Sequence, residues 1–168
     1  LPGIDGKAKM SKSLGNCIYL AEDPKDIKKK VMSMFTDPNH IRIEDPGSLE
    51  GNTVFTYLDA FCNDQHFEEY LPDYKNLDEL KEHYQRGGLG DVKVKKFLNN
   101  VLQEELEPIR KRREELQKDI PYVYEVLKKG SEVARETAAQ TLHEVRDAMK
   151  INYFDDMELI RSQAKKYE

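Results

Sequence analysis

The sequence predicts a mainly α-helical protein, in which a loop and a short strand precede a helical bundle. Three observations support this fold class. Apolar residues recur at spacings of three and four along most of the chain, as the buried face of a helix requires. Residues suited to start a helix precede these runs, and proline or glycine follows them. Residues 1–22 precede the first helical run and show no helical periodicity, so we expect them to form a separate part, followed by one helical domain over residues 23–168.

The first part is expected to be a loop followed by a strand. Residues 1–22 contain three of the nine glycines and a stretch rich in lysine and serine, which is typical of a mobile loop. The apolar run Cys17–Ala21 follows it, and its short length predicts a buried strand at residues 17–20. This is the longest apolar run of the chain, far shorter than the roughly 20 residues that cross a membrane.

A helix is expected to begin after Asp23. The Asp23 carboxylate can cap the helix, and Pro24 suits the first helical position. Residues 37–39 end it, and the prolines and glycines that follow predict a turn-rich connection. The apolar face of this helix consists of Ile27, Val31 and Met34.

Three shorter helical segments follow. The first starts at Asn52 or Thr53, and the second surrounds Phe67. The third starts at residues 76–79, where an asparagine precedes a glutamate by three residues as in a capping box. The glycines after Arg86 end it, because glycine accepts the left-handed conformation that terminates helices.

The clearest helical pattern covers residues 91–118, although Pro108 interrupts the run and predicts a kink. Another run starts at Pro121, and Gly130 within it leaves open whether it forms one helix or two. A last short helix is expected over residues 155–166. Because every run has one apolar face, we expect these faces to pack on one another as a bundle.

Composition excludes several function classes. The 27 lysines and arginines oppose 32 acidic residues, and the net charge of −5 argues against a protein that binds polyanions over its whole surface. The mean hydropathy of −0.80 argues against a membrane-spanning helix. Two cysteines are too few for a disulfide framework or a four-cysteine zinc site, which favours a reducing, cytoplasmic compartment.

Most catalytic patterns are missing from the sequence. It contains no glycine-rich dinucleotide fingerprint, no P-loop and no nucleophile elbow. The four histidines stand far apart and none has a partner at a metal-binding spacing, so we predict no metal site and assign them ordinary surface or packing roles. They are His40, His66, His83 and His143.

The segment Lys9–Ser13 is the candidate for chemistry. It places two ammonium groups three residues apart, with hydroxyl groups beside them and glycines on either side. Lysine brings positive charge to phosphate oxygens, and hydroxyls and free loop amides add hydrogen bonds. Such cations accelerate nucleotidyl transfer when they meet the charge that grows on the leaving phosphates. The alternative is a solvated linker of lysine and serine.

These five residues spell KMSKS, the second signature of class I aminoacyl-tRNA synthetases, and their surroundings resemble the bacterial tryptophanyl-tRNA synthetase family. The resemblance extends from residue 1 to about residue 150. The segments that carry it are Leu1–Gly6, Ser13–Asn16, Thr36–Pro38, Asp45–Gly47, Glu50–Asp59, Gly90–Lys93 and Leu106–Arg110.

The resemblance implies a Rossmann-type catalytic domain joined to a C-terminal helical domain of the anticodon-binding type. Enzymes of this family activate tryptophan with ATP and Mg²⁺, release pyrophosphate, charge tRNA(Trp), and are typically homodimers. On this chain, Lys9 and Lys12 would stabilise charge on the departing pyrophosphate, and Met10, Ser11 and Ser13 would complete the ATP-binding loop. Residues 1–22 would be a remnant of the catalytic domain, and residues 23–168 would bind tRNA.

The 168 residues lack the family's HIGH-like signature, its tryptophan pocket and most of its Rossmann strands. We therefore expect a C-terminal fragment that is inactive alone and needs no cofactor of its own. Its first 22 residues should be poorly anchored or packed unusually. Within the helical part, Arg110, Arg112 and Arg113 are the candidates for contact with the tRNA backbone. A solvated face balanced by neighbouring glutamates explains this cluster equally well.

Two other interpretations stay open. The chain could be a stand-alone helical interaction module in which KMSKS is incidental, or a fragment of the related tyrosyl-tRNA synthetase. Incidental matches would not reproduce so many flanking segments in order, and Asp45–Asp59 resembles the tryptophan enzyme better. Finding or not finding a HIGH-like signature and nucleotide-binding strands upstream would discriminate an enzyme from an interaction module.

Overall fold

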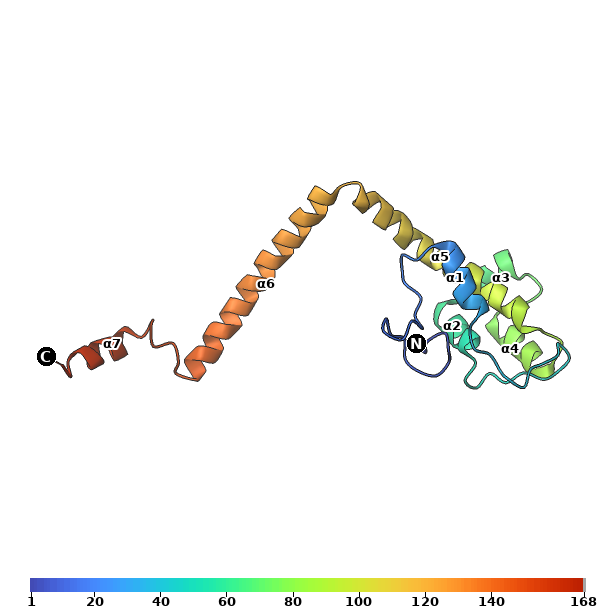
Figure 1. The fold of residues 1–168 in the computed structure, drawn as a ribbon, viewed down its shortest axis with the longest axis horizontal. Helices are drawn as coiled ribbons and strands as arrows, with labels where there is room; N and C mark the ends of the chain where they lie inside the picture. The colour runs from blue at the N-terminus through green and yellow to red at the C-terminus, as the bar shows by residue number, and fades with distance from the viewer. Residues whose placement is uncertain (168) are drawn as a thin grey trace. The chain divides into compact units, whose positions relative to one another are not determined.

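The computed structural model describes residues 1–167, which form seven α-helices and no strand (Figure 1). The mainly α-helical class is therefore confirmed. The helices are α1 (Pro24–Met32), α2 (Thr53–Phe61), α3 (Asp64–Tyr70), α4 (Leu77–Arg86), α5 (Asp91–Gln117), α6 (Ile120–Ala148) and α7 (Met157–Ala164).

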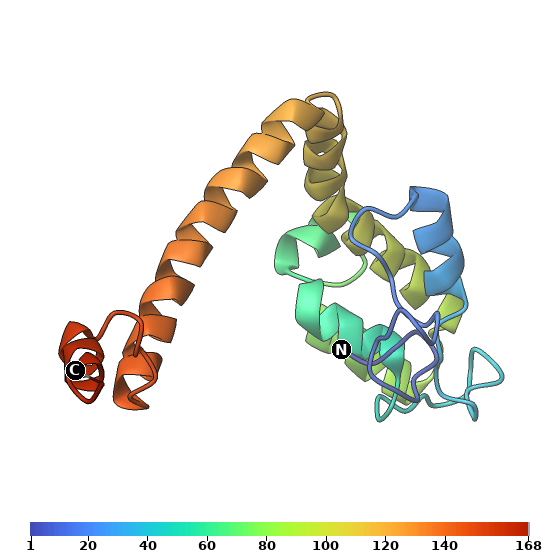
Figure 2. The same ribbon diagram turned by 60° about the vertical axis from the view of Figure 1, so that its left-hand side comes forward.

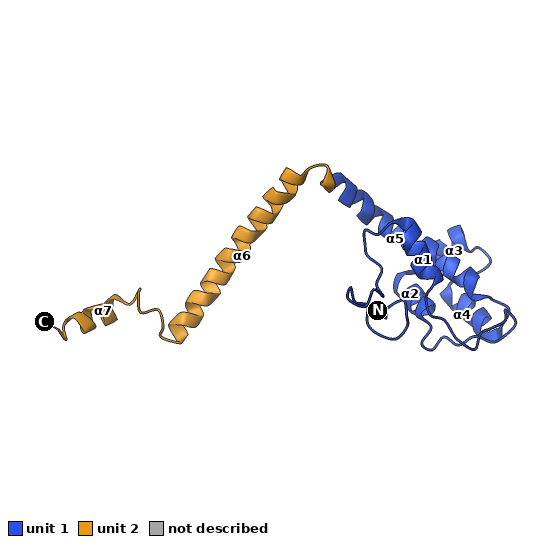
Figure 3. Cartoon of the chain, viewed as in Figure 1, with its two compact units in different colours: residues 1–115 blue, residues 116–168 orange. Residues whose placement is uncertain are grey.

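Contacts divide the chain into two compact units (Figure 3). The first, Leu1–Glu115, holds α1 to α4 and most of α5, together with the N-terminal loop. The second, Leu116–Glu168, holds α6 and α7. The assignment of residues 1–22 to a catalytic domain and of residues 23–168 to a tRNA-binding domain stays a prediction.

The helices of the first unit begin where the capping residues predict. Asp23, Asn52 and Asn76 each precede a helix, and each side chain accepts a hydrogen bond from a backbone amide two or three residues later. Such a bond satisfies one of the amides that the first turn leaves without a partner. Asn63 caps α3 in the same way, and His66 completes its capping box.

Aromatic side chains join the helices of the first unit. Phe67 of α3 packs on Phe97 of α5, with ring centroids 4.7 Å apart. Phe55 of α2 packs on Tyr84 of α4 at 4.8 Å. Figure 2 shows α1 beside the first half of α5, and the Gln103 side chain of α5 donates to a backbone carbonyl at the start of α1. These contacts give the unit one continuous apolar core.

The strand predicted at residues 17–20 is wrong. These residues form no strand pairing, because no segment within residues 1–167 lies beside them as a partner strand. Their backbone groups bond to side chains instead: Lys30 donates to the Cys17 carbonyl at 2.8 Å, and the Tyr19 amide donates to Glu22 at 3.1 Å. Cys17 is buried, whereas Leu20 is 62% exposed.

The two long helices are continuous. Pro108 lies inside α5 without ending it, and Gly130 lies inside α6, so the second run is one helix. A glycine costs a helix only about 1 kcal/mol relative to alanine, which neighbouring helix formers can outweigh. Within the second unit no residue of α6 or α7 is buried, so the predicted burial of these apolar faces is not found there. No helix in the described residues combines the length and apolarity that crossing a membrane requires.

A substitution at Gly47 should test the packing around Tyr84. A β-carbon at Gly47 would lie 2.2 Å from the Tyr84 ring, and that ring is fully buried. We expect Gly47→Ala to lower the free energy of unfolding by about 2 kcal/mol in urea denaturation. Gly130→Ala is the control: a β-carbon there meets no atom within 4 Å, and inside α6 alanine should raise the free energy of unfolding by up to about 1 kcal/mol. Equal stability of Gly47→Ala and the unsubstituted chain would contradict the packing described here.

Candidate functional site

The Lys9–Ser13 segment begins on a firmly held backbone. Lys9 forms an isolated antiparallel bridge with Pro2, and the Gly3 amide donates to the Ala8 carbonyl at 2.7 Å. The Met10 side chain is partly buried and packs against the core. The backbone of residues 8–10, which includes the first two residues of the motif, is therefore paired with residues 1–3.

The rest of the segment forms an exposed turn. The Gly15 amide donates to the Lys12 carbonyl at 3.2 Å, and Gly15 has a φ of 65°, which favours glycine. The hydroxyl groups of Ser11 and Ser13 lie 2.8 Å apart. Lys9 and Lys12 are exposed, and neither forms an ion pair with another of the residues 1–167. Both ammonium groups thus remain available to an anionic ligand.

Of the two alternatives expected for residues 1–22, poor anchoring is not what the structure shows, because two hydrogen bonds tie this segment to the helical core. The Tyr57 hydroxyl of α2 donates to the Pro2 carbonyl at 2.8 Å, and the Phe35 amide donates to the Ile4 carbonyl at 2.9 Å. Burial raises the pKa of Tyr57 to about 12, so this phenol stays a donor at neutral pH. The sequence offers no local sign of these contacts, because their partners lie 31 to 55 residues apart.

The three arginines proposed to contact tRNA differ in their surroundings. Arg110 is partly buried, and its Nη2 donates to the carbonyl and the side chain of Gln103 at 3.3 and 3.0 Å. Arg112 is exposed and pairs with Glu115 at 3.0 Å, and Arg113 is exposed. A surface pair of this kind contributes little to stability and can exchange its partner for a phosphate. The structure thus ties Arg110 to its own helix and leaves Arg112 and Arg113 accessible.

A partly buried polar network, which the sequence pattern did not reveal, surrounds Asp91 at the start of α5. The carboxylate accepts hydrogen bonds from Tyr84 at 2.7 Å, Thr36 at 2.7 Å and His40 at 3.0 Å. An ionised carboxylate only accepts, so the His40 Nδ1 carries the hydrogen. The His40 Nε2 is buried and has no partner within the described residues.

The network sets the charge of Asp91. Burial alone would raise its pKa, but the hydrogen bonds from Thr36, Tyr84 and His40 outweigh burial and hold the pKa below its usual range. Burial and the same Asp91 carboxylate raise the pKa of Tyr84 well above its ordinary value. Asp91 is therefore ionised at neutral pH and holds the turn-rich connection, α4 and α5 together.

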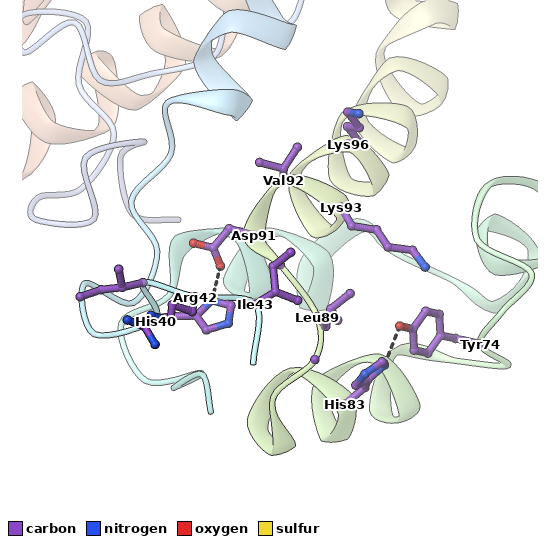
Figure 4. A pocket seen from close by; sticks show the side chains of 13 residues that line it. His40, Arg42, Ile43, Tyr74, His83, Leu89, Asp91, Val92, Lys93 and Lys96 are labelled. Carbon is purple, nitrogen blue, oxygen red and sulfur yellow. Dashed lines mark hydrogen bonds and ion pairs between the residues drawn. The ribbon is translucent and has the colours of Figure 1, made fainter. Parts of the chain in front are cut away.

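A cavity of about 600 Å³ lies next to this network (Figure 4). It is lined by His40 and Arg42 from the connection after α1, and by Lys96 from α5. On another side, Tyr74 and His83 are joined by a hydrogen bond of 2.8 Å, drawn as a dashed line in Figure 4. The remaining lining includes the Asp91 carboxylate and several apolar side chains, so the cavity offers a mixed surface of cationic, acidic, aromatic and apolar groups. Elsewhere, residues 1–167 contain no group of three His, Cys, Asp or Glu side chains that could hold a metal ion.

A comparison with protein families matches residues 1–107 to the family described as tRNA synthetases class I (W and Y). This match covers most of the chain, including the Lys9–Ser13 loop and the Asp91 network. The chain belongs to the class I tRNA synthetases of the W and Y family. Residues 9–13 thus lie within the segment that matches the family, which supports the KMSKS assignment more strongly than five residues alone.

Curated relatives and solved structures agree with the family. The tryptophan–tRNA ligase of Clostridium longisporum is 65% identical over 157 residues, covering 94% of this chain and 43% of the relative. That of Streptococcus agalactiae serotype V is 58% identical over 154 residues, covering 92% and 43%. A crystal structure of tryptophanyl-tRNA synthetase from Campylobacter jejuni with ADP and tryptophan is 28% identical, with a TM-score of 0.67, over 89% of this chain and 43% of that one. The chain thus spans less than half the length of the relatives it matches.

Proposed function

We propose that this chain is the C-terminal part of a tryptophan–tRNA ligase and supplies the cationic loop that contacts ATP during tryptophan activation. The observation that carries the proposal is the pair of exposed lysines, Lys9 and Lys12, without ion-pair partners among residues 1–167, on an anchored loop of a class I tRNA synthetase chain. The family description names both W and Y enzymes. Identities of 58% and 65% to tryptophan–tRNA ligases favour tryptophan over tyrosine as the substrate.

In the proposed reaction the tryptophan carboxylate attacks the α-phosphorus of ATP. A bond forms between the carboxylate oxygen and this phosphorus, and the bond to the bridging oxygen of the β-phosphate breaks. The electron pair leaves with pyrophosphate, which yields tryptophanyl-adenylate. The Lys9 and Lys12 ammonium groups would stabilise the charge that grows on the pyrophosphate, with Lys12 as the stronger contributor. Met10, Ser11 and Ser13 would shape the loop around the phosphates.

Magnesium would enter this reaction with ATP. The described residues contain no cluster of carboxylates that could form a magnesium site of their own. We therefore assign no residue of this chain to the metal. We also propose that the complete enzyme is a homodimer and that it is located in the cytoplasm.

The second part of the proposal is that the helical region binds tRNA(Trp). Arg112 and Arg113 are accessible to phosphates, whereas Arg110 is bonded to Gln103. The cavity beside His40 offers the cationic and aromatic groups that hold unpaired nucleotides. An interaction module without enzymatic ancestry is not supported, because the family match extends from residue 1 to residue 107.

Activity should appear only when the rest of a ligase is present. We expect the isolated chain to catalyse no tryptophan-dependent exchange of pyrophosphate into ATP, because Lys9 and Lys12 have no bound substrate to meet. The full-length Clostridium longisporum ligase with this chain in place of its matching segment, hereafter the chimera, should catalyse this exchange. Robust exchange by the isolated chain would contradict the first expectation, and an inactive but folded chimera would contradict the proposed function.

Reversing the exposed arginine charges should test the tRNA contact. We expect Arg112→Glu with Arg113→Glu in the chimera to weaken tRNA(Trp) binding and to reduce the slope of log affinity against log salt by about 1 for each phosphate that is no longer neutralised. Lys29→Glu on α1 is the control, because the Lys29 side chain is also exposed and, like Arg112, forms an ion pair within its own helix. Adding Arg110→Glu should give the complete charge reversal of the cluster. Unchanged affinity and salt slope in the triple variant would assign these arginines to a solvated helix face.

A further inference from the structure

The Asn16 side chain closes the turn that carries Lys12. Asn16 is 4% exposed, although the residues on its N-terminal side are exposed. Its Oδ1 accepts a hydrogen bond from the Ser11 amide at 2.8 Å, inside the motif. Its Nδ2 donates to the Asp5 carboxylate at 3.2 Å, on the opposite side of the loop. One buried carboxamide therefore joins the middle of the motif to the base of the loop.

The base to which Asn16 is attached is itself fixed. The Asn16 carbonyl accepts from the Ile4 amide at 2.9 Å, and the Ile4 carbonyl accepts from the Phe35 amide. Gly3 lies directly against the carboxamide, because a β-carbon there would be 2.1 Å from the Asn16 Nδ2. The space around this side chain thus admits little rearrangement.

The backbone positions of the two lysines depend on different contacts. Lys9 lies on the bridge to Pro2, before the Ser11 amide, so its backbone is held whether or not Asn16 is present. Lys12 lies on the turn between the Ser11 amide and Asn16, and the Asn16–Ser11 bond closes that turn. Removing the carboxamide should therefore release Lys12 and leave Lys9 in place.

We propose that Asn16 is a positioning residue that sets the place of Lys12 relative to the ATP phosphates through its paired bonds to Ser11 and Asp5. The inference rests on the proposed function. Positioning of a transition-state contact affects the rate far more than substrate binding, because an error of about 1 Å in a catalytic group can cost up to a hundredfold in rate. The role needs a donor toward Asp5 and an acceptor toward Ser11 at once, which a carboxamide supplies.

The first test measures the loop directly in the isolated chain. We expect hydrogen exchange at the Ser11 amide to be slower than at the exposed Ser13 amide. Asn16→Ala should speed exchange at Ser11 at least tenfold, which corresponds to the loss of one hydrogen bond of about 1.4 kcal/mol. Asn39→Ala, an exposed asparagine outside the loop, is the matched control. Unchanged exchange at Ser11 in Asn16→Ala would overturn the proposed bond.

The second test measures catalysis in the chimera. We expect Asn16→Ala to lower the kcat of pyrophosphate exchange about tenfold, while the KM for tryptophan stays unchanged and the protein stays folded at the assay temperature. Asn16→Asp should also slow the reaction, because it removes the donor and places two carboxylates together. Adding Asp5→Asn to it should restore the rate, since the asparagine and aspartate then exchange roles in the same hydrogen bond.

The outcomes separate this inference from the proposed function. An inactive chimera rejects the proposed function, and the role of Asn16 with it. An active chimera whose kcat is unaffected by Asn16→Ala rejects only the positioning role. A variant that loses tryptophan affinity and thermal stability together with kcat, and that the exchanged pair does not rescue, shows that Asn16 is a folding residue and also overturns the proposal.

Discussion

Replacing Lys12 by alanine in the chimera is expected to lower the kcat of tryptophan-dependent pyrophosphate exchange by about a hundredfold, which is the effect of removing one preorganised donor from a developing oxyanion. The ammonium group is exposed and forms no ion pair with residues 1–167, so its loss should not disturb the fold. Because the charge is needed mainly when pyrophosphate leaves, the KM for tryptophan should change little.

Lys7 supplies the control for this prediction. It is an exposed lysine of the same loop and lies outside the motif, so Lys7→Ala makes the same change in net charge. We expect Lys7→Ala to retain nearly full activity and Lys9→Ala to lose less than Lys12→Ala. Equal activities of Lys7→Ala and Lys12→Ala would show that the loop acts only through its overall charge, or not at all.

Asp91→Ala is expected to have the largest effect on stability, about 3 kcal/mol in urea denaturation, because it leaves two buried donors, Tyr84 and His40, without an acceptor. The side chains of Tyr84 and His40 lose their partner at positions where solvent hardly replaces it. Asp91→Asn retains one acceptor oxygen and should cost less. Asp78→Ala, in the exposed first turn of α4, is the control.

The pH dependence of stability should identify the same network. The pKa of Asp91 is held below its usual range, so the unfolded chain binds this proton more readily than the folded one. The contribution is therefore complete above the unfolded value of about 3.9 and is lost as the pH falls through the lower folded pKa. Asp91→Asn should flatten this acid loss of stability. If the stability of Asp91→Asn falls with decreasing pH as steeply as that of the original chain, the network described here is contradicted.

Local chemistry made the helices of the first unit predictable. Asp23, Asn52 and Asn76 are capping residues whose preference arises from a bond to the next turn, so the sequence alone locates them. The strand at residues 17–20 failed because pairing depends on a distant neighbour, and Lys30 and Glu22 satisfy that backbone instead. Gly130 does not interrupt α6, because one residue of low helix propensity is not enough to end a long helix.

The candidate site was likewise predictable only where its residues are neighbours in the sequence. The sequence identified Lys9 to Ser13 because the five residues are contiguous and their chemistry is cationic. It missed the role of Asn16, whose importance depends on burial and on the Asp5 carboxylate 11 residues away. It also missed the Asp91 network, whose donors Thr36 and His40 are 55 and 51 residues distant. Arg110 looked equivalent to Arg112 in sequence, and only the helix geometry turns it toward Gln103.

The lysine dependence of tryptophan-driven pyrophosphate exchange in the chimera tests the proposed role of the loop most directly. We expect exchange by the chimera, and its near-complete loss when Lys9 and Lys12 are both replaced by alanine in a protein that keeps its thermal midpoint. Full exchange by that double variant would show that this loop does not serve the ATP phosphates and would overturn its proposed role in tryptophan activation.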